Sequence, residues 1–256
     1  DRSGSMGTKD MTDGEERLEV ARDSIISAIS TLFDELGSTL QIGLVSYDSS
    51  LYTTTAFTDE EGESDLIDVV SLYTEKGGGT HTYLGINEAT SLFDGVADDE
   101  NVAKIAILLS DGMPTDSSSS STDGVAGATA ATQALIAAGY EMYSIALTSD
   151  EDLIEDMNVW SSNTVQIDSS SYSTGNAYNT DNLIDYSYSG TSTADISGAY
   201  EAIVDSIVGG TAAIVSSSDG DVVVDTGSVG DAHNITLPWP SEFACDGVTE
   251  TEVPIQ

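Results

Sequence analysis

The sequence predicts an α/β fold, namely a doubly wound, mostly parallel sheet with helices on both faces, one antiparallel edge strand and a small C-terminal β appendage. Short apolar runs typical of buried strands alternate with longer segments whose apolar residues recur at helical spacing. Such alternation is typical of βαβ units and a parallel sheet. The chain has 256 residues, 39% of them apolar, which is enough for one good-sized hydrophobic core.

The first half of the chain shows this alternation clearly. A helix is expected from Thr12 to Gly37, because apolar residues recur at spacings of three and four and Thr12 with Glu15 forms a capping box. The apolar run at 41–47 is typical of a buried strand, and the alternating run at 51–57 suits an edge strand. Shorter helices are expected at 64–73 and 82–93.

The second half continues the pattern and then changes character. Strands are expected at 103–109, 141–147 and 165–168, and helices at 124–138, 152–157 and 195–208. Residues 169–193 form a long stretch rich in Ser, Thr, Asn and Tyr, which we expect to be an irregular loop. Short β-like runs follow. We therefore expect an α/β domain over 1–210 and a β-rich appendage, or the start of a second domain, over 211–256.

The charge is extreme. Against 45 acidic residues stand 6 Lys and Arg, so the formal net charge is −39, and all six cations lie in the first 104 positions. This field repels phosphate backbones and anionic lipids, which argues against binding nucleic acid or a membrane surface through a basic patch. It favours cationic partners and metal ions. Near-absence of Lys predicts a protein of an extreme halophile, since molar salt screens such repulsion, and an acidic mesophilic surface protein is the alternative.

Three further features concern the chain's surroundings. The single cysteine, Cys245, has no partner for an internal disulfide, so it is either a structural thiol or pairs outside this chain. No apolar run is long enough to predict a membrane span in this segment. Asn234 begins an N-glycosylation sequon, which favours an extracellular or cell-surface location.

Hard oxygen donors follow the strands expected at the centre of the sheet. Asp1, Ser3 and Ser5 precede the first helix, Thr80 precedes another, and Asp111 ends the strand at 103–109. Ligands of open α/β sheets bind beyond the carboxyl ends of the strands, where these residues are expected to meet. Two carboxylates and three hydroxyls suit Mg²⁺, with Mn²⁺ or Ca²⁺ as related choices.

These motifs carry a family resemblance over roughly residues 1–210. The DRSGS, GGTHT and AILLSDG segments are similar to the metal-ion-dependent adhesion site of von Willebrand factor A domains, also called integrin I-type domains. The resemblance implies that Asp1, Ser3, Ser5, Thr80 and Asp111 hold the metal, and that the metal binds a partner's Glu or Asp. It further implies adhesion, or assembly of a surface filament such as a pilus from several subunits, with a protein or glycan partner presenting a carboxylate.

The sequence supports other functions less well. The same family resemblance also fits an intracellular module that partners an ATPase machine such as a metal chelatase. A metallohydrolase using Asp1 and Asp111 would need a general base that the sequence does not reveal. The segment around Ser5 is not a nucleophile elbow, and no P-loop is present. We therefore expect a binding module and no enzyme.

Two expectations concern less regular parts of the chain. The tyrosines of the 169–193 segment are expected to contact the partner, because the segment follows the strand at 165–168 and would emerge beside the metal loops; they are Tyr172, Tyr178, Tyr186 and Tyr188. The resemblance also implies a buried central strand immediately before Asp1. We accordingly expect that either about six apolar residues precede Asp1 or another subunit donates this strand, and that residues 1–256 alone do not fold.

Overall fold

The computed structural model describes residues 1–97, 102–116, 120–168, 171–174, 186–209, 212–216, 221–226 and 235–238. The chain divides into two compact units, residues 1–203 and residues 204–256, and each unit is considered by itself. The domain boundary expected near residue 210 stays a prediction. The positions of Cys245 and Asn234 lie outside the described residues.

A parallel three-stranded sheet lies at the centre of the first unit. Its order is β3-β4-β7, and the strands are β3 (Ile105–Ser110), β4 (Glu141–Ala146) and β7 (Ser187–Ser189). Ile107 is in register with Tyr143, and Ile145 with Tyr188. Every residue of β4 after Glu141 is buried, as its central place requires. The α/β class with a parallel sheet is thus confirmed.

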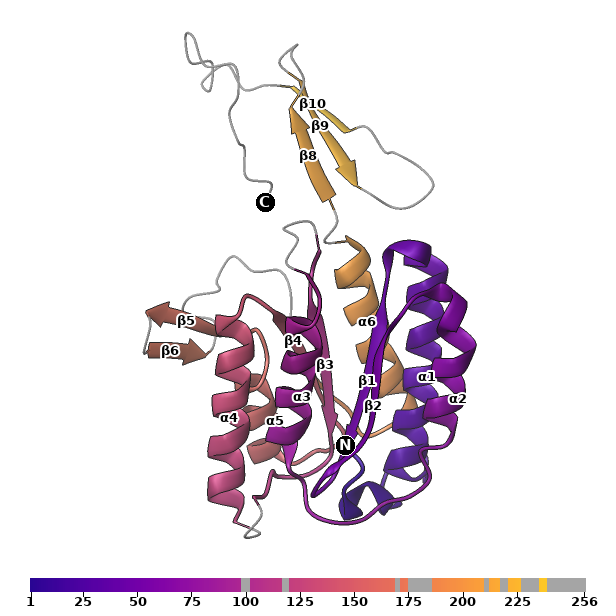
Figure 1. Ribbon diagram of the computed structural model, residues 1–256, viewed down its shortest axis with the longest axis vertical. Helices are drawn as coiled ribbons and strands as arrows, with labels where there is room; N and C mark the ends of the chain where they lie inside the picture. The colour runs from indigo at the N-terminus through magenta and orange to yellow at the C-terminus, as the bar shows by residue number, and fades with distance from the viewer. Residues whose placement is uncertain are drawn as a thin grey trace. The chain divides into compact units, whose positions relative to one another are not determined.

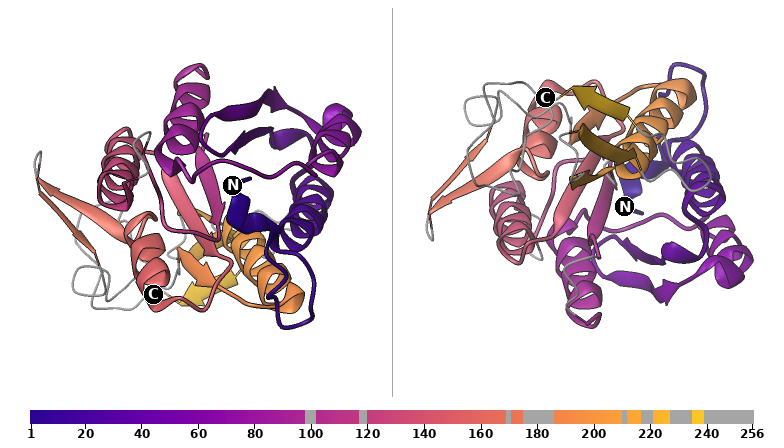
Figure 2. Two further views of the ribbon diagram at one scale, coloured as in Figure 1. Left: turned by 90° about the horizontal axis from the view of Figure 1, so that it is seen from below. Right: turned by 90° about the horizontal axis from the view of Figure 1, so that it is seen from above.

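A second, two-stranded sheet lies beside the first. It consists of β1 (Ile42–Tyr47) and the antiparallel β2 (Leu51–Thr58). Among the described strands β1 pairs only with β2, and β3 pairs only with β4. The first residues connect the two sheets, because the Asp1 amino group donates to Leu109 O at 3.2 Å and the Arg2 amide donates to Tyr47 O at 2.7 Å. Figures 1 and 2 both show the N-terminus between β1 and β3.

Two hydrophobic cores join helices α1 to α5 to these sheets. The helices of the first unit are α1 (Arg17–Leu36), α2 (Glu63–Ser71), α3 (Thr82–Asp94), α4 (Ser121–Ala137), α5 (Glu151–Val159) and most of α6 (Thr193–Gly209), with short 3₁₀ turns at Gly4–Gly7, Gly37–Thr39 and Glu60–Gly62. One core joins α3, α4 and α5 to β3 and β4 around Leu135 and Trp160. The other joins α1 and α2 to β1 around Phe33 and Leu66.

The first helix begins later than the sequence pattern predicted. It starts at Arg17, and its N-cap residue, Glu16, makes no side-chain cap. The capping box expected at Thr12 is wrong, because the Thr12 amide donates to Thr191 O at 2.6 Å in a tertiary contact. The helix end is as predicted, since Gly37 takes a φ of +51° that favours glycine.

The strand predicted at 165–168 exists but does not join the parallel sheet. β5 (Thr164–Asp168) pairs with the antiparallel β6 (Ser171–Thr174) instead. The third parallel strand is β7, which lies inside the 169–193 segment that we expected to be irregular. β7 is only three residues long, so it carries no apolar run that sequence periodicity could detect.

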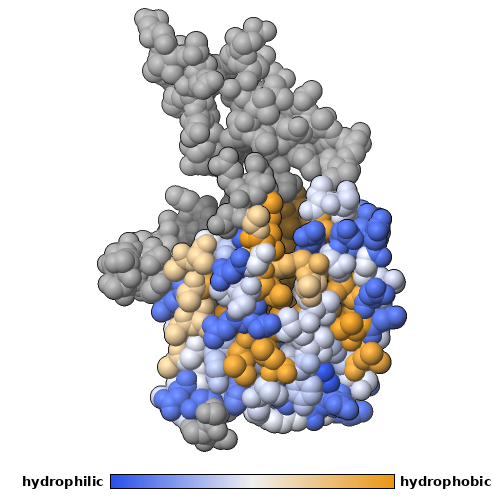
Figure 3. Space-filling view, viewed as in Figure 1, coloured by the Kyte–Doolittle hydropathy of each residue, from blue (hydrophilic) through white to orange (hydrophobic). Residues whose placement is uncertain are grey.

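The second unit is described through the end of α6 and three strands. The strands are β8 (Ala212–Ser216), β9 (Asp221–Thr226) and β10 (Ile235–Pro238), which form an antiparallel sheet in the order β10-β9-β8. Among the described residues no helix has the length and hydropathy needed to cross a membrane. Hydrophilic and apolar residues are interspersed over the described face of the first unit (Figure 3).

The facing edges of β1 and β3 predict that one added strand stabilises the protein. Ile42 and Leu44 in β1, and Ile105 and Ile107 in β3, are only half buried. Fusing about six apolar residues directly before Asp1 should let them pair with both edges and bury further side chains, each worth roughly 1.5–3 kcal/mol. We expect the free energy of unfolding to rise by several times the contribution of one buried side chain. Urea titration in molar KCl measures it. A Gly-Ser extension of equal length is the control, and equal stability of the two fusions would contradict the expectation.

Candidate metal site

The five predicted donors lie on three loops at the carboxyl ends of β1 and β3. The loop from Asp1 to Thr8 contains the 3₁₀ turn Gly4–Gly7. Thr80 stands two residues before α3, and Asp111 directly follows β3. The loops are tied together, because the Gly4 amide donates to Gly78 O at 3.4 Å and the Asp1 amino group reaches Leu109 O. The topology thus brings residues 110 positions apart in the sequence to one edge.

The carboxylate of Asp1 is oriented by two hydrogen bonds. Its Oδ1 accepts from the Ser3 amide at 2.8 Å, and its Oδ2 accepts from Ser110 Oγ at 2.7 Å. Ser110 is fully buried, so this second donor is held in place by the end of β3. Asp1 itself is half buried. Both carboxylate oxygens of Asp1 therefore accept hydrogen bonds from Ser3 and Ser110, which fix their orientation.

The serine hydroxyls connect this loop to Asp111. Ser3 Oγ and Ser5 Oγ are 3.0 Å apart, and Ser5 Oγ donates to Asp111 Oδ1 at 2.8 Å. The Asp111 side chain has no exposed surface, and Ser3 is 1% exposed. The structure therefore brings Ser3, Ser5 and Asp111 into one hydrogen-bonded chain, as the sequence motifs predicted.

Thr80 completes the group from the other side. A Cβ atom on Gly112 would lie 3.1 Å from Ser5 Oγ and 3.6 Å from Thr80 Oγ1, so both hydroxyls face the small space that Gly112 leaves open. The Thr80 backbone is fixed, since its amide donates to Thr115 Oγ1 at 3.0 Å and its carbonyl accepts from the Thr115 amide at 2.7 Å. All five predicted donors thus meet at one place.

Arg17 pairs with this site, which the sequence reasoning missed. Its Nη1 donates to Asp111 Oδ2 at 2.8 Å and to Asp111 O at 3.1 Å. Its Nε and Nη2 donate to the two carboxylate oxygens of Asp10 at 2.8 and 2.5 Å. Hydrogen bonding to the Arg17 guanidinium lowers the pKa of Asp10, and the two carboxylates raise the pKa of Arg17. Arg17 is therefore charged and bridges Asp10 to the site.

Arg2 was also missed, although it lies inside the DRSGS motif. It is 6% exposed, and its guanidinium lies 4.6 Å from the ring centre of Tyr52 and 5.1 Å from that of Tyr73. Its Nε and Nη2 donate to Glu75 O at 3.1 and 3.0 Å, and the Gly77 amide donates to Arg2 O. Arg2 thus fastens the loop that carries Thr80 to the loop that carries Asp1.

The donor set fits a hard divalent cation. It consists of carboxylate and hydroxyl oxygens, which Mg²⁺ prefers over nitrogen or sulfur. Within the described residues no group of three or more His, Cys, Asp and Glu is arranged to hold a metal. A metal here would therefore depend on the hydroxyls of Ser3, Ser5 and Thr80. His81 is 6% exposed and stacks on Tyr83, which is a packing role.

Of the four tyrosines predicted to contact a partner, the structure describes the burial of two, Tyr186 and Tyr188. Tyr186 is 7% exposed, its ring lies 4.8 Å from that of Tyr143, and burial raises its pKa to about 12. A partner-facing role for Tyr186 therefore does not fit its burial. Tyr188 is half buried in β7, and Tyr172 belongs to β6. Tyr178 lies outside the described residues.

The C-terminal end of this segment does reach the site side of the molecule. Asp13 Oδ2 accepts hydrogen bonds from the Thr193 amide at 2.9 Å and from Thr193 Oγ1 at 2.6 Å. These bonds, together with the Thr12–Thr191 contact, join the start of α6 to the loop that precedes α1. The two hydrogen bonds from Thr193 lower the pKa of Asp13. Among the described residues of the segment, those at 191–193 therefore contact the loop between the DRSGS motif and α1.

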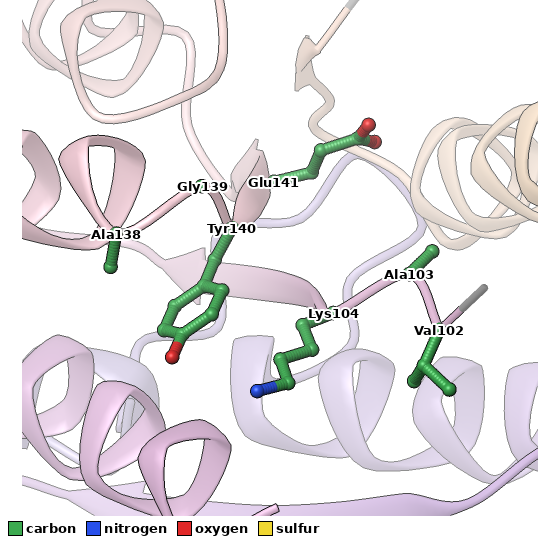
Figure 4. Close-up of a pocket in the computed structure, with 7 residues that line it drawn as sticks. All are labelled: Val102, Ala103, Lys104, Ala138, Gly139, Tyr140 and Glu141. Carbon is green, nitrogen blue, oxygen red and sulfur yellow. The ribbon is translucent and has the colours of Figure 1, made fainter. Parts of the chain in front are cut away.

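A small pocket lies at the opposite ends of the strands. It is lined by residues before β3 and between α4 and β4, among them Lys104, Tyr140 and Glu141 (Figure 4). Lys104 Nζ donates to Phe93 O and Val96 O at 3.0 and 3.2 Å and lies 5.0 Å from the Tyr140 ring centre. The lysine is thus engaged in holding the end of α3, and the pocket is separate from the candidate metal site.

Comparisons with known proteins identify the family and the fold. The profile of the von Willebrand factor type A domain matches residues 1–184, so the chain belongs to this family. No curated protein matches the chain. Two solved structures from pili share the fold at a TM-score of 0.59 each. They are the PilB minor pilin from Streptococcus sanguinis, a variant, at 14% identity, and the vWF domain of the type V pili tip protein Mfa5 from Porphyromonas gingivalis, at 15%.

The extent of these matches differs. The alignment covers 80% of this chain in both cases, with 59% of the PilB pilin and 92% of the Mfa5 domain. Proximal thread matrix protein 1 from the mussel byssus matches with a TM-score of 0.56 and 15% identity, over 86% of this chain and 47% of that protein. At these identities the likeness shows the fold alone. The chain spans less than two thirds of the pilin and the byssal protein.

The loop carrying Thr80 should tolerate no side chain at Gly78. Gly78 has a φ of +71°, and a Cβ atom there would lie 2.5 Å from Ser49 Oγ and 2.7 Å from Asp48 Oδ2. Gly78→Ala should therefore lower the free energy of unfolding by at least about 1–3 kcal/mol, as judged by denaturant titration. Gly77→Ala is the matched control, because a Cβ atom at Gly77 meets nothing within 4 Å. Equal stability of the two variants would contradict the geometry.

Proposed function

We propose that this chain is a metal-dependent module for adhesion or for assembly of a surface filament, and that it binds a carboxylate of a protein or glycan partner. The main support is the convergence of two carboxylates and three hydroxyls at one edge of the sheet, in a chain that belongs to the von Willebrand factor type A family. Pilus proteins among the structural neighbours support an extracellular or cell-surface setting.

The carboxylates and the hydroxyls of the site have different roles in the proposed binding. Asp1 and Asp111 would supply the negative charge that holds Mg²⁺, or Mn²⁺ or Ca²⁺, and Ser3, Ser5 and Thr80 would supply neutral oxygen donors. The bound cation would supply an electrophilic centre for one carboxylate oxygen of the partner. Ser110 and Ser5 orient the two aspartates through their hydrogen bonds of 2.7 and 2.8 Å. Neutral hydroxyls hold the cation without cancelling its charge.

An exposed aromatic ring beside the site suits contact with a partner. Tyr52 is 48% exposed, and Arg2, the neighbour of Asp1, lies against its ring. Aromatic side chains offer a large contact area at low entropic cost. We include Tyr52 in the proposed partner surface, together with Tyr172, Tyr178 and Tyr188.

Two other functions can be separated from this one by experiment. If the chain is an intracellular module that partners an ATPase or chelatase, a pull-down from cell extract with this chain as bait should capture an ATPase, and the capture should depend on nucleotide. The adhesion function predicts Mg²⁺-dependent, nucleotide-independent capture of a surface component. A metallohydrolase is the weakest of the three, because von Willebrand factor A domains are usually non-catalytic.

Metal binding is the first test of this proposal. Calorimetry in molar KCl should show one Mg²⁺ site in the folded protein and none in Asp111→Ala, because Asp111 is a buried carboxylate of the donor set. Ser5→Ala should weaken Mg²⁺ binding by roughly tenfold, since it removes one donor and the hydrogen bond to Asp111.

The control removes a carboxylate elsewhere. Asp123 lies in the first turn of α4, so Asp123→Ala changes the net charge equally without touching the site. Circular dichroism checks that each variant is folded. Undiminished Mg²⁺ affinity in folded Asp111→Ala, or equal losses in both aspartate variants, would contradict the assignment.

A further inference from the structure

The cations of this chain are concentrated around the candidate metal site. The chain carries only 6 Lys and Arg against 45 Asp and Glu. Arg2 and Arg17 contact the site loops directly, and Lys76 packs against Gly7 and pairs with Glu16. Lys9 is exposed in the loop between the DRSGS motif and α1. Most of the scarce positive charge therefore lies at one edge of an otherwise acidic molecule.

Arg17 occupies a position where a cation is normally unfavourable. It is the first residue of α1, where the helix dipole presents partial positive charge. It remains there because its side chain, 14% exposed, lies between two carboxylates. The Asp10 side chain is 48% exposed, whereas that of Asp111 has no exposed surface. The buried half of this bridge is thus the half that involves a candidate metal ligand.

The charge of the site depends on this contact. Two carboxylates, Asp1 and Asp111, would just neutralise a divalent cation. The guanidinium of Arg17, 2.8 Å from Asp111 Oδ2, adds one positive charge. The carboxylate of Asp10 offsets this charge, but its side chain is 48% exposed and screened by solvent, whereas Arg17 meets Asp111 in the buried part of the site. The buried part of a loaded site that keeps Arg17 in place is therefore net positive, and in a desolvated position a net positive site favours an anion over a neutral oxygen ligand.

We propose that Arg17 is a specificity-determining residue that weakens metal binding and, in exchange, makes the loaded site select a carboxylate. The inference rests on the proposed metal site. Arg17 repels the incoming cation and competes with it for Asp111 Oδ2, which lowers metal affinity. Once the cation is bound, the same charge strengthens attraction for an anionic partner. A purely structural role, fastening the loop before α1, would give neither effect.

The test compares two arginines of the same helix. Arg17→Gln removes the charge at the site, and Arg22→Gln removes an equal charge from a residue that pairs with its exposed neighbour Asp23. Calorimetry with Mg²⁺ in molar KCl should show about tenfold tighter binding for Arg17→Gln and no change for Arg22→Gln.

Carboxylate selection is measured with small probes. Acetate and acetamide are titrated into Mn²⁺-loaded protein, and paramagnetic relaxation of their methyl protons reports binding next to the metal. The wild-type protein and Arg22→Gln should favour acetate over acetamide by about tenfold, and Arg17→Gln should lose most of that preference.

A second variant should change the Mg²⁺ affinity in the opposite direction. Asp10→Asn keeps Arg17 but removes the carboxylate that shares its charge, so Mg²⁺ binding should weaken. This variant also tests the inference if Arg17→Gln does not fold. Unchanged or weaker Mg²⁺ binding in folded Arg17→Gln, or unchanged binding in Asp10→Asn, would overturn the role of Arg17 while leaving the metal site intact. Folded wild-type protein that binds no Mg²⁺ would overturn both proposals.

Discussion

The backbone hydrogen bonds of residues 1 and 2 are the contacts on which the rest of the site depends. The Asp1 nitrogen bonds to Leu109 O on β3, and the Arg2 amide bonds to Tyr47 O on β1. These two bonds place Asp1 at the carboxyl ends of β1 and β3, where its carboxylate accepts a hydrogen bond from Ser110. Ser3, which donates to Asp1, and Ser5, which donates to Asp111, both lie on the loop that this junction holds.

Sequence periodicity predicted those parts of the fold that bury continuous apolar runs. β1, β3 and β4 were foreseen because each contains a continuous apolar run. β7 was not, since its three residues, Ser187–Ser189, gain their place from pairing with the buried β4. The strand at 165–168 was foreseen but placed in the wrong sheet, because an apolar pattern specifies a strand and not its partner.

The donors of the site were predictable from motif spacing, but the arginines that surround them were not. Asp1, Ser3, Ser5, Thr80 and Asp111 follow strands, and the topology of an α/β sheet brings such residues together. Arg17 and Arg2 act through long side chains that cross from one loop to another, and no spacing rule predicts such contacts. The signal for Arg17 was its place at the start of a helix in a chain nearly devoid of cations, against the preference set by the helix dipole.

The net charge of −39 explains why recognition would depend on contacts of this short range. In the molar salt that such a surface predicts, the Debye length is roughly 3 Å, so attraction between distant charges is screened. A partner is then recognised only through groups that touch it or lie in a desolvated recess. The ion pair between Arg17 and the fully buried Asp111 side chain, at 2.8 Å, is within that range and shielded from the solvent. A carboxylate held by a metal at this edge would have the same property, so the proposed coordination is compatible with the strong negative charge of the chain.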